Sequence, residues 1–213
     1  MGSIKISWSK CYTIDGKLVY LPCLLLDLLG TTGMAAGNSF EEALLHGICE
    51  VIERHCQSLV KMYKIETPTI DIATITSPIV CSLLKKFAVL KRQKIIIKDF
   101  SLDFGLPVIG VIRTIGNDTC MITTGVATTP EEALIRALTE NSQVEGGDDA
   151  TAKQSYVKHH FTNKKVVSID DIPNISNSNI KTEIKIINKL LSNKKMRFFF
   201  VDTTNKILDI SSV

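Results

Sequence analysis

Two segments of the chain repeat one pattern at a fixed distance, and this repeat constrains the fold more than any other feature. The first segment is SFEEALLHGICEVIERH (39–55) and the second is TPEEALIRALTENSQVE (129–145). Glu41 matches Glu131, an offset of 90 residues. In each segment a Ser or Thr stands three residues before a glutamate, which is the capping-box pattern of a helix start. The sequence therefore predicts two equivalent helices.

The repeat also places polar side chains at matched positions of the two helices. Residues three or four apart share one face of a helix, so each matched set lies on a single face, apart from the apolar stripe. If the two helices pack side by side, several carboxylates and an amide share one small volume. The matched pairs are His46 with Arg136, Glu50 with Glu140, and Glu53 with Gln143.

A cluster of carboxylates of this kind favours a divalent cation. Like charges repel, and an isolated buried carboxylate costs several kcal/mol to desolvate. Mg²⁺ with oxygen ligands and bridging phosphate oxygens relieves both costs. Arg54 and Arg136 lie beside the acids and offer bidentate contacts to phosphate.

Other interpretations of the same glutamates remain open. They are also compatible with exposed surface residues held in salt bridges. A di-iron site of the ferritin type needs Glu-x-x-His, which neither helix supplies. No GxxxxGK[ST] loop occurs, so a nucleotide site here is not of the P-loop type.

The remaining sequence alternates strand-like and helical stretches, which predicts an α/β fold, an α+β sandwich with both helices packed on a β-sheet. A capped helix of about 20 residues is expected from Ser39, and a second from Thr129 to about Val144. Further elements are expected at 8–29 (strands around an Asp15-Gly16 turn), 78–93 (helix), 94–100, 106–114 and 120–127 (strands), 150–180 (polar surface excursion), 181–195 (helix) and 196–204 (buried strand).

Composition excludes several partners. The net charge is only +3, so nothing favours nucleic acid. The apolar run 18–30 contains Pro22 and Asp27 and falls short of the roughly 20 apolar residues that span a membrane. Six scattered cysteines form no CxxC pair, which is typical of free thiols in a reducing compartment. We therefore expect a cytoplasmic protein with no nucleic-acid or membrane partner.

The two helical segments resemble the motifs of a known family. TTGMAAGNSFEEALLHGICEVIERH (31–55) resembles the signature of the YcaO family, and PEEALIRALTENSQ (130–143) resembles its second helix. GGDD (146–149) looks like its following Gly-x-Arg-Asp-Asp element without the arginine, and RFFFVDTT (197–204) is similar to a later core strand. The chain is on this ground identified as a member of the YcaO family.

The resemblance implies a set of site residues and two cofactors, ATP and Mg²⁺. The Ser-x-x-x-Glu-x-x-Glu-Arg motif of the family falls on His46, Glu50, Glu53 and Arg54, and its Gln-x-x-x-Glu motif falls on Arg136 and Glu140. Gln143, Asp148 and Asp149 are carried over from less well matched positions. The implied ATP-binding residues are His46, Glu50, Glu53, Arg54, Arg136, Glu140 and Gln143, and the implied magnesium ligands are Glu50, Glu53, Glu140 and Asp149.

The implied activity is the ATP-dependent phosphorylation of a peptide backbone amide on its oxygen, in a ribosomally made peptide or protein. A side-chain nucleophile then gives an azoline, or an external sulfur donor gives a thioamide. His46 and Arg136 replace the residues of the better-known cyclodehydratases, which favours thioamide formation. The alternative is a catalytically incomplete relative that acts as a binding or dimerisation module.

The family domain is nearly twice as long as this chain. The sequence is therefore expected to form a single partial domain over 1–213, with a core at 8–150 and a C-terminal helix and strands at 181–213. We expect this chain alone to have an incomplete ATP site. The expected partners are a separately encoded N-terminal half, a TfuA-like protein, or further copies of the chain in a homo-oligomer.

Overall fold

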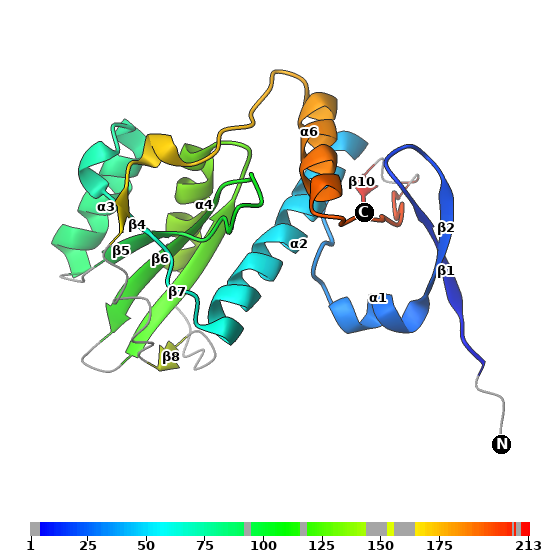
Figure 1. Cartoon of the computed structure of the whole chain (residues 1–213), viewed down its shortest axis with the longest axis horizontal. Coiled ribbons are helices and arrows are strands. Elements are labelled where there is room, and N and C mark those ends of the chain that lie inside the picture. Colours follow the sequence, from blue (N-terminus) through cyan, green and yellow to red (C-terminus); the bar gives the residue numbers. More distant parts are fainter. Residues whose placement is uncertain are drawn as a thin grey trace. The chain divides into compact units, whose positions relative to one another are not determined.

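The computed structural model describes residues 5–91, 95–115, 119–143, 153–155, 165–205, 207 and 210–213 (Figure 1). The chain divides into two compact units. One comprises Met1–Ile52 with Asn177–Val213, and the other comprises Glu53–Ser176. Helix α2 (Phe40–Tyr63) contributes to both. A division by internal contacts does not by itself separate domains, so the expected single domain over 1–213 stays a prediction.

The first unit begins with the predicted hairpin. Strands β1 (Trp8–Tyr12) and β2 (Leu18–Pro22) pair antiparallel, and Gly16 takes a positive φ of 78° in the turn between them. The predicted continuation of this strand region to Leu29 is wrong, because helix α1 (Cys23–Leu29) follows at once. Pro22 lacks an N–H for a sheet ladder and suits a helix start, and the leucines that follow favour a helix over a strand.

Helix α2 starts where the sequence predicts. The backbone N–H of Glu42 donates to the Ser39 hydroxyl at 3.2 Å, which confirms the cap. The Glu42 carboxylate accepts from the backbone N–H of Asn38 at 2.9 Å and from the Asn38 side chain at 3.1 Å. The box therefore closes one residue earlier than the standard pattern.

The end of the chain differs in part from the prediction. Helix α6 (Ile180–Asn193) confirms the expected helix. The buried strand predicted at 196–204 is wrong, because this segment contributes only an isolated bridge from Phe200 to Tyr12, and Phe199 is 39% exposed. The Phe200 ring packs against the rings of Tyr12 and Phe40, with centroids 5.9 and 5.5 Å apart. These ring contacts and two backbone hydrogen bonds between Tyr12 and Phe200 hold this segment in place of a continuous strand.

The remaining elements of the first unit are short. Strand β10 (Ser211–Ser212) pairs antiparallel with β3 (Ala36–Gly37).

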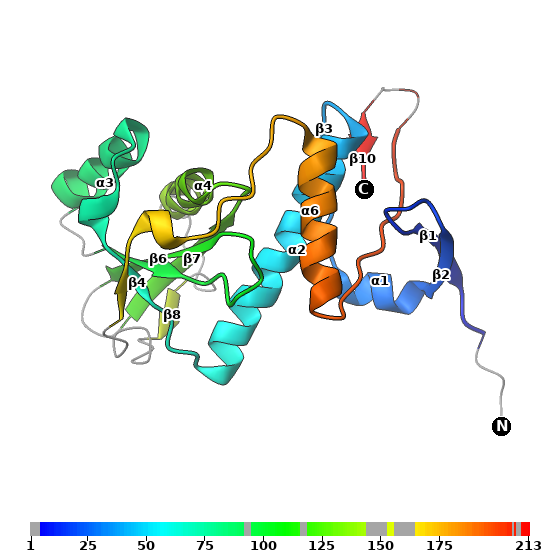
Figure 2. The same ribbon diagram turned by 45° about the horizontal axis from the view of Figure 1, so that its top comes forward.

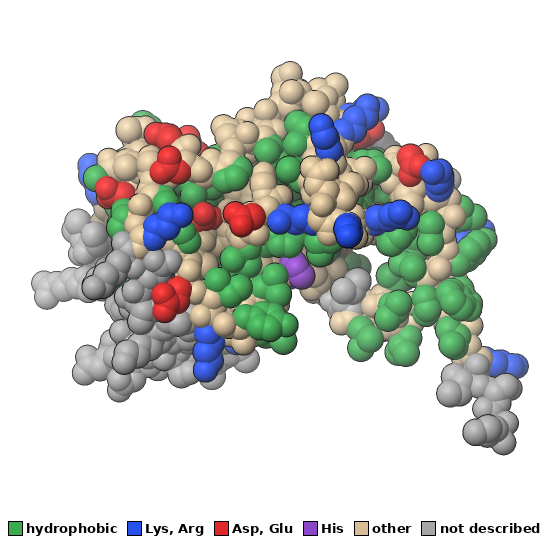
Figure 3. Space-filling model, in the orientation of Figure 1, with side chains coloured by type: hydrophobic (Ala, Val, Ile, Leu, Met, Phe, Trp, Pro, Cys, Tyr) green, Lys and Arg blue, Asp and Glu red, His purple; other side chains and the backbone are tan. Residues whose placement is uncertain are grey.

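Hydrophobic side chains gather on the surface of the hairpin and α1, as Figure 3 shows. They include Trp8, Leu18, Tyr20, Leu24, Leu25 and Leu28.

A six-stranded sheet forms the centre of the second unit, in the order β8-β7-β6-β5-β4-β9. All neighbours are antiparallel except β4 and β9, which are parallel. The three long strands confirm the three strands predicted before the second helix. The bounds are β4 (Thr69–Ile70), β5 (Ile95–Asp99), β6 (Val108–Ile115), β7 (Thr119–Val126), β8 (Lys153–Ser155) and β9 (Val166–Val167).

Helices α3 (Pro78–Lys91) and α4 (Pro130–Gln143) cover one face of this sheet, and both were predicted. Their apolar side chains and those of β4, β5 and β6 form a buried core. The mixed α/β fold class is thus confirmed. Two short 3-10 helices, η1 (Ile72–Thr74) and η3 (Ile169–Asp171), complete the described part.

The predicted polar excursion at 150–180 lies partly outside the described residues. Its described part belongs to the sheet and does not form a surface excursion, because β8 and β9 are the two edge strands. Ile172 is 4% exposed and joins the core under α3 and α4. None of the described helices combines the length and the apolar character needed to cross a bilayer.

Strand β7 and helix α4 approach each other very closely. A Cβ added at Gly125 would lie 2.2 Å from the carbonyl oxygen of Ala133 and 2.5 Å from the backbone nitrogen of Ala137. The Thr123 hydroxyl also donates to the carbonyl of Ala137 at 2.8 Å. Small residues on both elements therefore permit backbone-to-backbone packing here.

We predict that Gly125→Ala destabilises the chain by about 3 kcal/mol, because the added methyl group forces helix backbone away from the strand. Urea unfolding followed by circular dichroism measures this. Thr139→Ala, on the exposed side of α4, is the control and should change the free energy of unfolding by less than about 0.5 kcal/mol. Equal stability of Gly125→Ala and the wild type would contradict the close approach.

Candidate functional site

The predicted site residues are distributed over both units. His46 and Glu50 belong to the first unit, and Glu53, Arg54, Arg136 and Glu140 belong to the second. Gln143 is the last residue of α4, and nothing of its side chain is described. Asp148 and Asp149 lie outside the described residues. The pairing of Glu50 with Glu140 joins residues of different units and stays a prediction.

Glu50 is half-buried and has a backbone donor. The N–H of Gly33 donates to its Oε2 atom at 3.1 Å. Gly33 has a φ of 87°, and a Cβ there would lie 2.8 Å from Cγ2 of Val51. A Cβ at Gly47 would lie 2.7 Å from the Gly33 carbonyl oxygen. The two glycines therefore let the link before α2 approach the helix closely enough for this N–H to reach Glu50.

Glu53 is half-buried and has a side-chain donor from the sheet. The Thr124 hydroxyl, on β7, donates to its Oε1 atom at 2.5 Å. Thr124 itself is only 3% exposed. Sequence reasoning missed both Gly33 and Thr124 as neighbours of the site. For Thr124 the strand period of two was available as a signal, but nothing in the sequence indicated which helix its face would meet.

Arg136 and Glu140 are exposed and lie on one flank of α4. Ala133 and Ala137 of this helix contact β7, while Leu134 and Leu138 join the core shared with α3. Helical spacing puts positions 136 and 140 on the flank opposite these leucines. Since α3 packs toward β4 and β5, that opposite flank faces the β7 side of the sheet.

Side-by-side packing of the two repeated helices stays a prediction, because most of the repeated part of α2 belongs to the first unit and α4 to the second; only residues 53–63 of α2 share a unit with α4. Thr123 and Gly125 of β7 face α4, whereas Thr124, between them, binds Glu53 of α2. Successive strand residues point to opposite faces, so β7 lies between α4 and the second-unit part of α2. Figure 2 shows α4 on one side of this strand and the end of α2 on the other. The sequence repeat fixes how each helix starts, not how the two pack.

The end of β7 that carries Thr124 is a sheet edge within the described residues. Strand β8 pairs only with Thr119, Cys120 and Met121. Beyond these residues β7 has a described neighbour on one side alone, β6. Within the described part of the chain, β7 therefore has no second neighbouring strand at Thr124.

The donor chemistry of the site residues fits a hard cation. Among the described residues no three His, Cys, Asp or Glu side chains gather in a group that would hold a metal by itself. Mg²⁺ usually takes one or two carboxylates and completes its shell with water and substrate phosphates. The carboxylate oxygens of Glu53 and Glu140 in the second unit, and of Glu50 in the first, match that requirement.

The start of α2 carries two acidic groups with lowered pKa values. Hydrogen bonds from the backbone and side chain of Asn38 hold the pKa of Glu42 below its usual range. The ammonium group of Lys181, 3.0 Å away, lowers the pKa of Glu41. Both groups are therefore ionised at neutral pH, next to the helix end where negative charge is favoured.

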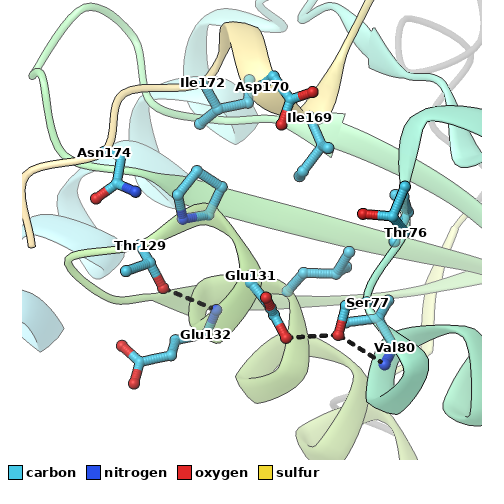
Figure 4. A pocket seen from close by; sticks show the side chains of 13 residues that line it. Thr76, Ser77, Val80, Thr129, Glu131, Glu132, Ile169, Asp170, Ile172 and Asn174 are labelled. Carbon is cyan, nitrogen blue, oxygen red and sulfur yellow. Dashed lines mark hydrogen bonds between the residues drawn. The ribbon is translucent and has the colours of Figure 1, made fainter.

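A groove of about 530 Å³ lies at the start of α4, on the face of the sheet that α3 and α4 cover (Figure 4). Its apolar wall includes Ile75 and Leu134, and its polar rim includes Glu131, whose carboxylate accepts from the Ser77 hydroxyl. None of the predicted site residues lines it. The groove and the Thr124 face are thus separate features of the second unit.

Sequence comparison places this chain in a family. The family model described as YcaO cyclodehydratase, ATP- and Mg²⁺-binding, matches residues 3–213. An uncharacterized protein of Methanothermobacter thermautotrophicus is 27% identical over 208 residues, which cover 87% of this chain and 54% of that protein. An uncharacterized protein of the tfuA 3′ region of Rhizobium leguminosarum bv. trifolii is 25% identical, over 67% of this chain and 40% of that protein.

Solved structures share the fold. The heterocyclase TruD superposes with a TM-score of 0.82 at 20% identity, over 96% of this chain and 33% of TruD. YcaO from Methanopyrus kandleri, bound with AMPPCP and Mg²⁺, superposes with a TM-score of 0.78 at 20% identity, over 96% of this chain and 62% of that protein. The Escherichia coli microcin synthetase McbBCD complex with pro-MccB17 bound gives 0.55 at 16% identity, over 87% of this chain and 57% of that one.

Fold and sequence together define an α/β protein of the kind that binds ATP and Mg²⁺. The chain belongs to the YcaO family, which confirms the resemblance of its helical motifs. ATP and Mg²⁺ are the cofactors of this family. The chain spans about half the length of the curated relatives that it matches.

We predict that the Glu42 carboxyl titrates below its ordinary value in the folded chain, and that Asn38→Ala raises this pKa partway, because the backbone donor remains. A lowered folded pKa adds stability above the unfolded value, about 4.3, and this stability is lost as the pH falls through the folded pKa. NMR titration of the carboxyl carbon measures the pKa. Asn193→Ala, at the end of α6, is the control; an ordinary Glu42 pKa in the wild type would contradict the contact.

Proposed function

We propose that this chain binds ATP with Mg²⁺ and activates a backbone amide of a ribosomally made peptide or protein, and that the product is a thioamide. The observation that carries the proposal is the hydrogen bond from Thr124 to Glu53, which holds a motif carboxylate at the edge of β7. The flank of α4 that bears Arg136 and Glu140 borders the same strand from its other face. Membership in the YcaO family indicates ATP as the nucleotide and Mg²⁺ as the metal.

The proposed roles follow the family motifs. Glu50, Glu53, Glu140 and Asp149 bind Mg²⁺, and His46, Arg54, Arg136 and Gln143 contact the nucleotide. Bound Mg²⁺ would neutralise charge on the triphosphate, which is the main help that phosphoryl transfer needs. The AMPPCP and Mg²⁺ bound to the Methanopyrus kandleri relative support this assignment.

The protein groups have distinct tasks in this proposal. The guanidinium groups of Arg54 and Arg136, exposed in the second unit, can each contact two phosphate oxygens. Their charge disperses the negative charge that develops on the transferred phosphoryl group. Glu53, fixed by Thr124, supplies a ligand whose position is set before the nucleotide arrives.

The reaction balances when the external donor provides sulfur in the oxidation state of hydrosulfide. The amide oxygen attacks the γ-phosphorus, a P–O bond forms, and the bond to the β-phosphate oxygen breaks so that ADP leaves. The sulfur nucleophile then attacks the amide carbon, and the C–O bond breaks so that the oxygen departs with phosphate. The amide becomes a thioamide, ATP becomes ADP and phosphate, and no oxidant is needed.

Two observations favour a thioamide over an azoline. His46 and Arg136 stand where better-known cyclodehydratases carry a small polar residue and an amide. A relative 25% identical to this chain is encoded in the tfuA 3′ region of Rhizobium leguminosarum bv. trifolii. We therefore infer that a TfuA-like protein is a partner, beside the peptide substrate.

The remaining partner proposals follow from the length of the chain, which matches only part of each relative. The chain covers 62% of the Methanopyrus kandleri protein and 54% of the Methanothermobacter protein. A separately encoded half, or a second copy of this chain, would supply the nucleotide contacts of the remainder. The McbBCD complex with pro-MccB17 shows that a protein of this fold can work within an assembly that holds another polypeptide.

We predict that the chain binds AMPPCP with Mg²⁺, and that Glu53→Ala weakens this binding by about 100-fold, because a charged ligand of the metal is lost. Isothermal titration calorimetry measures both affinities. Thr139→Val, on the exposed side of α4, is the control and should bind as the wild type does.

The alternative of a non-catalytic module gives the opposite result. If neither the wild-type chain nor its mixture with a separately encoded half binds the nucleotide, the proposed function is wrong and the module is favoured. Equal binding by Glu53→Ala and the wild type would refute the assigned role of this glutamate.

A further inference from the structure

We propose that Thr124 is a positioning residue, whose hydroxyl fixes the carboxylate of Glu53 in the orientation that binds the divalent cation. The inference rests on the proposed function and extends it to a residue outside the helical motifs. Its basis is the hydrogen bond from Thr124 Oγ1 to Glu53 Oε1 at 2.5 Å. The two residues are 71 positions apart in the sequence, so the contact joins a helix to the sheet.

Thr124 itself is held firmly in place. Its backbone lies in the β6–β7 ladder opposite Gly110, and its side chain is 3% exposed. Gly110 leaves room for the Phe100 ring, whose Cε2 atom would lie 2.9 Å from a Cβ at that position. Residues paired across two strands share a face, so this ring packs beside Thr124. Thr124 therefore sits next to an apolar wall.

The side-chain chemistry of threonine suits this task. A β-branched residue has few χ1 rotamers, so its hydroxyl is aimed before any ligand binds. A hydroxyl that donates to a carboxylate makes a short, charge-assisted hydrogen bond. Outer partners of this kind orient metal ligands, and their removal usually costs 10-fold to 100-fold in metal affinity.

The neighbouring threonines show that this contact differs from an ordinary structural one. The Thr123 hydroxyl donates to the Ala137 carbonyl on the opposite face. The Thr139 hydroxyl donates to the Ile135 carbonyl within α4. Thr124 is the one of these three whose hydroxyl meets a motif carboxylate, which predicts an effect on metal binding that the others lack.

The test compares Thr124→Val, which removes the hydroxyl at nearly constant shape, with Thr124→Ser, which keeps it. Mn²⁺, detected by electron paramagnetic resonance, replaces Mg²⁺ in titrations of the full chain with AMPPCP present. We expect Thr124→Val to weaken Mn²⁺ binding by about 10-fold to 100-fold. Thr124→Ser should stay within about threefold of the wild type, and Thr139→Val should match it.

The outcomes separate this inference from the proposed function. A wild-type chain that binds Mn²⁺ and a Thr124→Val chain that binds it equally well would overturn the role of Thr124 alone. If neither the wild-type chain nor its mixture with a separately encoded half binds Mn²⁺ with AMPPCP, the proposed function is overturned together with this role.

A metal-free measurement adds a readout independent of the nucleotide. In urea unfolding, the midpoint shifts of Thr124→Val and Glu53→Ala should be non-additive in the double variant, because the two side chains form one contact. Additive shifts would show that the contact is absent in solution and would overturn the inference. The same unfolding curves show whether each variant is folded.

Discussion

The alternation of strand β7 is the constraint on which the second unit depends. Thr123 and Gly125 turn toward α4, where only a glycine lets the helix backbone come so near, and Thr124 turns the other way to bind Glu53. One strand thus fixes a helix on one face and a motif carboxylate on the other. A shift of one residue in its register would exchange these roles and abolish both contacts.

Much of the fold followed from the sequence because local signals and tertiary packing agree. The caps at Ser39 and Thr129 are set by side-chain chemistry within a few residues, and both helices start there. The strands β5, β6 and β7 are rich in β-branched residues and lie in a sheet as predicted. The family was also visible in the sequence, because its motifs lie on those two capped helices.

The predictions that were wrong concern segments whose structure depends on contacts with residues distant in the sequence. Apolar residues after Pro22 form a helix, since the proline ends the strand and the leucines that follow favour a helix. Phe200 packs on the rings of Tyr12 and Phe40 instead of entering a sheet. The packing of the repeated helices against each other stays a prediction, because a repeat in sequence specifies two similar elements and does not specify how they pack. Thr124 became visible as a neighbour of Glu53 only through the contact of β7 with α2.

We propose above all that the motif carboxylates bind the metal of a bound ATP near the edge of β7. A crystal structure of the chain with AMPPCP and Mg²⁺, together with any partner that it requires, tests this most directly. We predict carboxylate oxygens of Glu50, Glu53 and Glu140 in the ligand shell, at about 2.1 Å from Mg²⁺ where they bind directly. Nucleotide density in the groove at the start of α4, with these three carboxylates away from any metal, would contradict it.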